Sequence, residues 1–247
     1  MATETKNSLA IILSRADYRE NDSWLEVYSE EFGKLQLVAR GAKKISSKLS
    51  GHLEPFNLVK LLIIKGRYRD YVGSALTTDS FLSIKSDLNK IFYAGAGLRL
   101  IKRLIKDGEA DQQIFALLLN YLQLIDQSQT ETMSQALGDL SQGYFTLRLL
   151  SYLGYQPELQ HCLTCQQVVP ANNNYFSLAA GGLICGTCQR AGSPEPPGQL
   201  IKVSNNCIKL MRLFLTEDET ILKNLKVTPS YSKELLSLAN NFINFHF

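Results

Sequence analysis

Four of the five cysteines in this chain form two C-x2-C pairs, and this arrangement constrains the fold more than any other feature. The first pair is Cys162 and Cys165, the second is Cys185 and Cys188, and 19 residues separate the pairs. Each pair makes a tight turn that directs two sulfur atoms at one point, and two such turns at this separation match four-thiolate zinc sites. We therefore predict one structural Zn²⁺ per chain, bound by all four cysteines.

Four protein thiolates leave no open coordination position, so this metal would organise a fold and would not activate water. The spacer between the pairs, with Tyr175 and Phe176 flanked by turn-forming residues, predicts a short hairpin. A mononuclear iron site, two disulfides and redox-active cysteine pairs are the alternatives. Cys207 lies in an apolar segment and is expected in the core, and His161 is not needed as a ligand.

The composition indicates a protein with its own hydrophobic core. The chain has 247 residues, of which 45% are hydrophobic, and its cysteines are too sparse for a disulfide-stapled secreted scaffold. The apolar run near the N-terminus is too short for a signal peptide. The longest charge-free apolar segment, Gln112–Ile125, has 14 residues, fewer than the roughly 20 that a bilayer span needs. We expect a cytoplasmic protein that does not enter the membrane.

Positive charge is concentrated in one window of the sequence. Between Lys34 and Arg69 there are nine Lys or Arg residues and one acid, Glu54, whereas the whole chain has a net charge of only +3. Such asymmetry is typical of a surface that binds a polyanion, most often nucleic acid, although a solvated surface that binds nothing is the alternative. The candidate DNA-binding residues are Lys34, Arg40, Lys43, Lys44, Lys48, Lys65, Arg67 and Arg69.

Residues 8–80 have the pattern of five short strands. Runs rich in β-branched and aromatic residues, such as WLEVYS and KLQLVAR, are separated by turn signals such as EFGK and KGRY. Five strands in this length favour an OB-type barrel over residues 1–80, with an SH3-like barrel as the alternative. Tyr68 and Tyr71 could stack on bases or pack the barrel.

After residue 80 the hydrophobic period becomes helical. The sequence predicts helices at 97–106, 114–125, 134–153, 205–215 and 230–245. The fold class is therefore α+β: a barrel, a helical domain of residues 81–160 and 199–247, and a zinc-ribbon-like insert at 161–192. The first helix carries a basic face, which is a candidate partner-binding surface or simply a solvated one: Arg99, Lys102, Arg103 and Lys106.

Catalytic signatures are missing from the sequence. It contains no phosphate-binding loop of the GxxxxGK[ST] type, no nucleophile elbow and no H-E-x-x-H motif. We therefore expect a protein that is not an enzyme. A thiol oxidoreductase and a nuclease are weaker alternatives, because the C-x-x-C pairs lack a βαβ context and the acids lack a spacing that would bind Mg²⁺.

Two separate motifs resemble one family. The run AIILSRADYRENDSWLEVYSEEFGKLQLVARGAKKISSKLSGHLEPF resembles the N-terminal barrel of the bacterial recombination mediator family RecO. The stretch FTLRLLSYLGYQPELQHCLTC resembles the segment that leads into the zinc insert of that family. The resemblance covers nearly the whole chain in order, although the last 50 residues are less diagnostic.

The resemblance implies an ATP-independent role in recombinational repair. RecO proteins bind single- and double-stranded DNA, anneal complementary strands, and act with RecR and RecF to load RecA onto DNA coated by single-stranded-DNA-binding protein. They contact that coating protein through its acidic, hydrophobic C-terminal tail. The alternative is an RNA-binding interaction module that combines an OB-fold with a zinc ribbon, which a preference for RNA over DNA would reveal.

Overall fold

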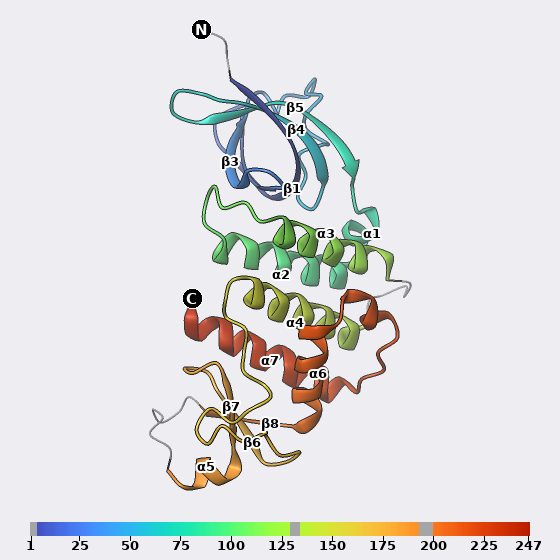
Figure 1. Cartoon of the computed structure of the whole chain (residues 1–247). Coiled ribbons are helices and arrows are strands. Elements are labelled where there is room, and N and C mark those ends of the chain that lie inside the picture. The colour runs from blue at the N-terminus through green and yellow to red at the C-terminus, as the bar shows by residue number, and fades with distance from the viewer. Residues whose placement is uncertain (1–3, 129–133, 193–199) are drawn as a thin grey trace. The chain divides into compact units, whose positions relative to one another are not determined.

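The computed structural model describes residues 4–128, 134–192 and 200–247. By its contacts the chain divides into two compact units, Met1–Ser128 and Gln129–Phe247. Figure 1 shows a β-barrel with helices in the first unit and helices with a small sheet in the second. None of the helices in the described ranges is both long enough and apolar enough to cross a membrane.

The first unit begins with a closed five-stranded barrel. Its strands are β1 (Thr5–Asp17), β2 (Ser23–Ser29), β3 (Gly33–Ala39), β4 (Leu58–Ile64) and β5 (Asp70–Asp79). They close in the order β1-β2-β3-β5-β4, and every pairing is antiparallel except β3 with β5. The five expected strands and the OB-type barrel are confirmed.

Side-chain alternation explains why these segments form a barrel. Leu25 and Val27 of β2 point into the core with Leu37 of β3 and Leu61 of β4, and each is at most 1% exposed. Residues between them point outward, so Trp24 and Glu26 lie on the outer face of β2. Long β1 pairs with both β2 and β4, which closes the sheet on itself.

Three helices follow the barrel within the first unit: α1 (Leu82–Ser86), α2 (Leu88–Leu104) and α3 (Gln112–Gln127). The side chains of Asp87 and Asp111 accept hydrogen bonds from backbone N–H groups in the first turns of α2 and α3. Figure 1 shows α2 and α3 running side by side. In the interior, the Lys90 ammonium donates to Ser83 Oγ and to the carbonyl oxygens of Asp126 and Ser128, which ties the three helices together.

These helices are fastened to the barrel by buried contacts. Lys34 Nζ on β3 donates to the Lys102 carbonyl at 2.9 Å and lies 3.3 Å from Asp107 Oδ1. Gly33 lies so close to the Glu109 backbone that a Cβ there would collide with it. By contacts, the barrel and α1–α3 lie in one compact unit and the later helices in the other, and the expected domain boundary at residue 80 stays a prediction.

A second ion pair attaches α2 to the outer face of β2. Glu26 Oε2 accepts from Ser14 Oγ at 2.6 Å and pairs with Lys102 Nζ, which itself lies 3.0 Å from Ser14 Oγ. Burial opposes ionisation of Glu26, but the hydrogen bonds from Lys102 and Ser14 outweigh it and lower the pKa of this carboxyl.

The second unit combines three long helices with a three-stranded sheet. The helices are α4 (Gln135–Tyr152), α6 (Asn205–Thr216) and α7 (Pro229–His246), with a 3-10 turn η1 (Glu219–Lys223). The sheet has the order β7-β6-β8, formed by β6 (Asn174–Ser177), β7 (Gly182–Cys185) and β8 (Leu200–Val203), and a short helix α5 (Gly186–Arg190) follows β7.

The expected hairpin between the cysteine pairs is confirmed as β6 and β7, and the expected helices are confirmed, although α2 spans Leu88–Leu104 where 97–106 was expected. Residues 200–203 differ from expectation, because they were placed in the helical domain but form β8. Their alternation of apolar and polar side chains suits a strand beside β6, with Val203 buried and Lys202 exposed.

Removing the charge of Glu26 tests the attachment of α2. A group with a depressed folded-state pKa stabilises the fold above its unfolded pKa, and that stability is lost as the pH falls through the folded value. We expect Glu26→Gln to cost about 1 kcal/mol at pH 7, since the pair is only half-buried, and progressively less as the pH falls below the ordinary range of a glutamate carboxyl. Urea unfolding followed by the fluorescence of Trp24, the single tryptophan, measures this difference at pH 7 and at pH 3.5.

Glu31→Gln, at an exposed acid on the barrel, is the matched control. An equal loss for Glu26→Gln at pH 7 and pH 3.5 would contradict the assignment.

Candidate metal centre and nucleic-acid interface

The first cysteine pair is held in a tight turn beside the hairpin. Gln166 N–H donates to the Cys162 carbonyl at 2.9 Å, and Gln166 adopts a left-handed backbone conformation with φ of 60°. Cys162 N–H donates in turn to the Gln167 carbonyl, and Leu163 N–H donates to the Leu183 carbonyl of β7. These bonds fix the first pair against the strand that carries the second.

The second pair joins a strand end to a helix start. Cys185 is the last residue of β7, and Cys188 lies on α5. Gly186 between them is required by close packing, because a Cβ would lie 2.5 Å from the Asn173 carbonyl oxygen. The turn therefore places both sulfur atoms on the side that faces the first pair.

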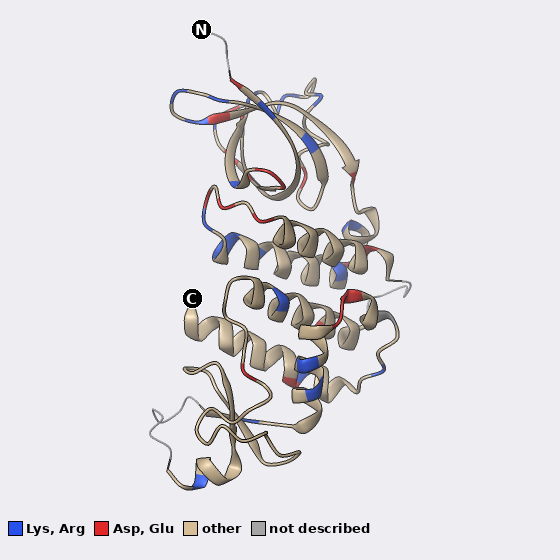
Figure 2. Cartoon of the chain, viewed as in Figure 1, with Lys and Arg blue, Asp and Glu red and all other residues tan. Residues whose placement is uncertain are grey.

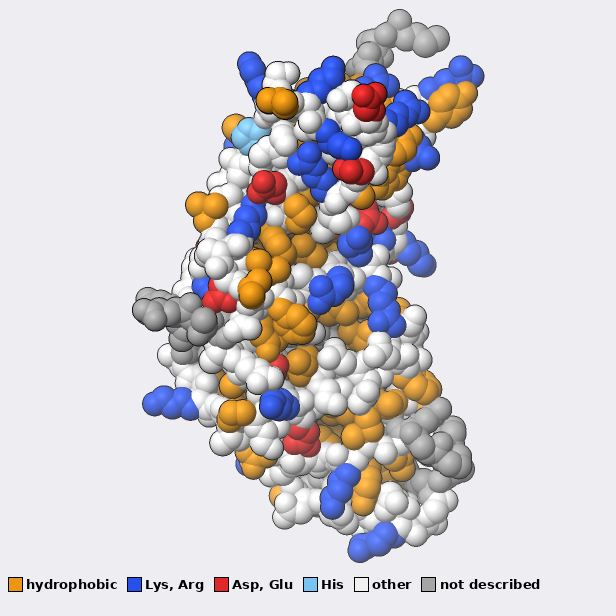
Figure 3. Space-filling view, turned by 180° about the vertical axis from the view of Figure 1, so that it is seen from behind, with side chains coloured by type: hydrophobic (Ala, Val, Ile, Leu, Met, Phe, Trp, Pro, Cys, Tyr) orange, Lys and Arg blue, Asp and Glu red, His pale blue; other side chains and the backbone are white. Residues whose placement is uncertain are grey.

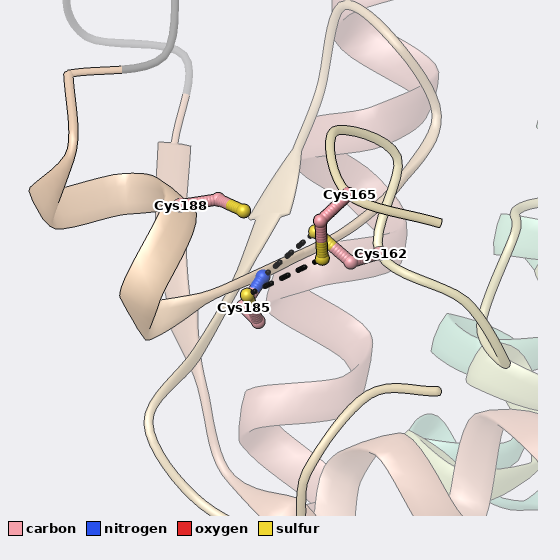
Figure 4. A group of neighbouring side chains, drawn as sticks. All are labelled: Cys162, Cys165, Cys185 and Cys188. Atoms are coloured by element: carbon pink, nitrogen blue, oxygen red, sulfur yellow. Dashed lines mark hydrogen bonds between the residues drawn. The ribbon is translucent and has the colours of Figure 1, made fainter. Parts of the chain in front are cut away.

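The four sulfur atoms converge, as Figure 4 shows. All lie within 4.8 Å of one another, and Cys165 Sγ lies 4.0 Å from Cys185 Sγ. Tetrahedral zinc with Zn–S bonds of about 2.3 Å separates its sulfur ligands by about 3.8 Å, so this set fits the ion after small adjustments. The four predicted ligands are confirmed as one cluster that can hold a metal ion.

Local hydrogen bonds prepare one of these sulfurs to bind a cation. Burial opposes ionisation of Cys162, but backbone N–H groups, among them that of Cys185 at 3.3 Å from its sulfur, outweigh burial and lower the pKa of this thiol to about 6. The pKa of Cys188 is raised to about 12 by its hydrogen bond with Cys185 and by burial. Metal binding to this set therefore releases protons.

Two other residues, His161 and Cys207, lie outside the sulfur cluster, as expected. His161 is half exposed and lies 3.8 Å from Glu158, outside the sulfur cluster. Cys207 is fully buried on α6, and burial raises the pKa of its thiol to about 12. Cys207 is thus a core residue in the described structure.

The candidate DNA-binding residues do not all share one environment. Lys34 is 9% exposed, and its ammonium is held by Asp107 and the Lys102 carbonyl, so its charge is satisfied inside the protein. Lys43 pairs with Asp17 at 3.1 Å and Lys65 pairs with Glu4 at 3.0 Å, both at the surface. Surface pairs of this kind contribute little and can exchange partners.

The other five candidates lie exposed on two loops and a strand end. Arg40 follows β3, Lys44 and Lys48 lie in the loop of residues 40–57, and Arg67 and Arg69 lie in the loop between β4 and β5. Figure 2 shows Lys and Arg on this last loop, which projects from the barrel, and Figure 3 shows basic side chains gathered over one face of the barrel.

Arginine side chains pack on aromatic rings across three neighbouring strands. Val38 of β3 pairs with Trp24 of β2 on one side and with Tyr71 of β5 on the other, so the three side chains stand in one row. The Arg69 guanidinium lies 4.6 Å from the Trp24 ring centroid, and the Arg40 guanidinium lies 3.8 Å from the Tyr71 ring centroid. We call Trp24, Tyr71, Arg40 and Arg69 the aromatic ledge.

The sequence pattern pointed to Tyr68 and Tyr71 as stacking residues. It did not point to Trp24, which precedes the basic window. The signal that could have found it is the alternation of β2, which places Trp24 outside the barrel while Leu25 is buried. A groove of about 680 Å³ opens beside it, lined among others by Gln36, Arg67 and Tyr68.

The structure changes which residues can form the candidate partner-binding face. Lys102 is engaged with Glu26, and Lys106 lies beyond the end of α2 at Leu104. Leu104 is also buried and unavailable to a partner. Arg99 and Arg103 remain exposed, and Phe92 and Leu88, at 59% and 84% exposure, precede them at helical spacing. We call these four residues the α2 stripe.

Comparison with known proteins agrees with both halves of the chain. The family model described as recombination protein O N terminal matches residues 1–81, and recombination protein O C terminal matches residues 85–247. The chain belongs to the RecO family. The two models meet close to the end of the barrel strands.

Several relatives named DNA repair protein RecO match nearly the full chain. The relative from Dehalococcoides mccartyi is 33% identical over 92% of this chain and 84% of its own length. The relative from Desulfitobacterium hafniense is 31% identical over 94% and 82%, respectively. That from Desulforamulus reducens is 28% identical over 96% and 88%.

Loss of one ligand tests the metal centre. We expect Cys162→Ser to lower bound zinc from about one per chain to near zero and to unfold the small sheet, because a metal that joins the two turns contributes directly to folding. Elemental analysis measures the metal, and the fluorescence of Trp24 on β2 shows that the barrel stays folded. His161→Ala is the matched control next to the ligand and should keep its zinc. Full zinc occupancy in Cys162→Ser would show that the ligand set is wrong.

Proposed function

We propose that this protein is a non-catalytic mediator of recombinational DNA repair that binds DNA and anneals complementary strands in the bacterial cytoplasm. In this role it would act with RecR and RecF to load RecA onto DNA coated by single-stranded-DNA-binding protein. Membership of the RecO family supports the repair role. Zn²⁺, held by the four cysteines, would stabilise the sheet of the second unit.

The observation that carries the proposal is the set of exposed cations beside the aromatic ledge. Arg40 and Arg69 each pack on a ring of one row, and Lys43 N–H donates to the Asn21 carbonyl in the loop before β2, so two loops and a strand end meet near this row. Each cation that contacts a phosphate releases a condensed counterion, which favours binding without reading sequence.

Annealing requires two polyanions to approach each other. A protein without ATP can promote this step by neutralising phosphates while leaving the base edges of a strand accessible. The face of an OB-fold that binds oligonucleotides includes β2, β3 and the β4–β5 loop. In this chain, that face carries Arg40, Arg67 and Arg69.

The α2 stripe suits the acidic, hydrophobic tail of the coating protein. Leu88 and Phe92 offer apolar surface, and Arg99 and Arg103 follow two and three turns later. A short peptide that ends in an apolar residue and carries carboxylates could contact both parts. This placement replaces Lys102 and Lys106 with two exposed apolar residues.

Strand annealing tests the proposed function. We expect the protein to accelerate annealing of two complementary oligonucleotides coated with the cognate single-stranded-DNA-binding protein, without nucleotide. If about six cations contact phosphate, the log-log salt slope for single strands should be about −4. Replacement of both Arg67 and Arg69 by Gln should reduce the magnitude of the slope by about 1.4, to about −2.6, and slow annealing, because two contacts are lost.

Lys60→Gln is the matched control, since Lys60 is an exposed cation of the same basic window but lies on the outer face of β4, beside a different groove. No acceleration by the wild-type protein, or a salt slope near zero, would contradict the proposal. A stronger affinity for RNA than for DNA of the same sequence would favour an RNA-binding module instead.

Charge reversal tests the α2 stripe. We expect Arg99→Glu with Arg103→Glu to weaken binding of a fluorescent tail peptide at least tenfold, because attraction becomes repulsion. Phe92→Ala should weaken binding without changing its salt dependence. Arg190→Glu, an exposed site on α5, is the control. Unchanged affinity of the double variant would reject this placement.

A further inference from the structure

We propose that the aromatic ledge is a stacking site for an unpaired nucleobase, with Trp24 as its central ring. This inference rests on the proposed DNA binding and deepens it, because it separates recognition of single strands from general attraction to phosphate. Neither the basic window nor the family match assigns a role to Trp24. The argument uses the register of three strands, the exposure of the rings and the neighbouring cations.

The strand register places the ledge outside the barrel. Leu25, Leu37 and Val72 belong to the buried barrel core, so their neighbours Trp24, Val38 and Tyr71 face outward. Val38 is nevertheless only 2% exposed. Its cross-strand neighbours are the two rings, and a guanidinium lies over each ring, so the ledge is an aromatic layer faced by cations.

The outer face of the same strands is closed at one end and open at the other. Glu26 is paired with Lys102 of α2, and Gln36 Nε2 donates to Asp107 Oδ2 at 2.9 Å in the loop after α2. Two residues from Glu26 along β2, Trp24 is partly exposed and lines the groove of about 680 Å³. This volume lies within the range of ligand sites.

Charges of both signs line the groove, with Asp70 beside Arg67 and Arg69 and with Lys34 beside Asp107. Asp107 at the closed end is shared by Lys34 and Gln36. Arg67 and Arg69 line the open part, and the Arg69 guanidinium also lies 5.7 Å from the ring centroid of Tyr18. A phosphate backbone would therefore follow the arginines, with its bases directed at the rings.

The chemistry of the ledge favours unpaired bases of any sequence. Aromatic rings and guanidinium planes stack on the π-face that every base presents, and such stacking contributes about 1–3 kcal/mol per base in single-strand binders. In a duplex the bases are already stacked on each other, so a duplex can reach the cations but not the rings.

The single tryptophan makes this inference directly measurable. We expect an oligothymidylate to quench Trp24 fluorescence, and a blunt duplex of equal length to bind with much weaker quenching. An abasic strand carries the same phosphates without bases and isolates the stacking contribution. Wild-type protein should prefer oligothymidylate over the abasic strand about 5- to 140-fold.

Trp24→Ala should remove most of this preference, because affinity for oligothymidylate falls much more than affinity for the abasic strand, and Trp24→Phe should keep most of it. Tyr155→Ala, at an exposed aromatic residue of the second unit, is the matched control. An equal loss of affinity for both strands in Trp24→Ala, or no loss for either, would overturn the inference.

Should Trp24→Ala not fold, the wild-type quenching and the Trp24→Phe variant still decide the question. Equal quenching by duplex and single strand would also overturn the inference that the ledge stacks on unpaired bases. If DNA binding does not depend on Trp24, only the proposed stacking site is rejected. If the protein binds no DNA at all, the proposed function itself is rejected.

Discussion

Two lysine–carboxylate pairs determine how the outer face of the barrel is used. Lys102 with Glu26, and Lys34 with Asp107, attach α2 and its following loop to β2 and β3. Because each lysine is held where it is partly or largely removed from water, its charge is satisfied within the protein and does not contribute to a surface. The remaining outer face, around Trp24, is left for the arginines of the loops. One sheet surface thus serves both internal packing and the proposed contact with DNA.

Much of this architecture could be predicted because its signals are local. Alternation in segments such as WLEVYS defines strands, helical spacing defines α3 and α7, and two cysteine pairs define one sulfur cluster. The errors concern long-range partners. Lys34 was grouped with its neighbours in sequence, but Asp107, which neutralises it, lies more than 70 residues away. Lys102 was assigned to a free helix face for the same reason, since Glu26 lies on a distant strand.

Local sequence patterns could not predict the boundary between the units or the role of Trp24 either. Whether α1–α3 belong to the barrel depends on contacts such as Gly33 against Glu109, which no periodicity reveals. Trp24 stands outside the basic window, and only the register that sets it beside Val38 connects it to Tyr71 and Arg40. In both cases the missing information is which strands become neighbours, and closure of the barrel decides that.

The two sheets differ in their exposure to strand addition. The barrel closes on itself, so each of β1–β5 has a paired neighbour on both sides, although β3 and β5 are joined only at Leu37–Asp70 and Val38–Tyr71. The small sheet is open, and there the cysteine turn covers β7, because Leu163 and Glu158 exchange backbone hydrogen bonds with that strand. At the other side β8 is four residues long and presents exposed Lys202. A short edge with a charged side chain discourages pairing with a strand of another molecule.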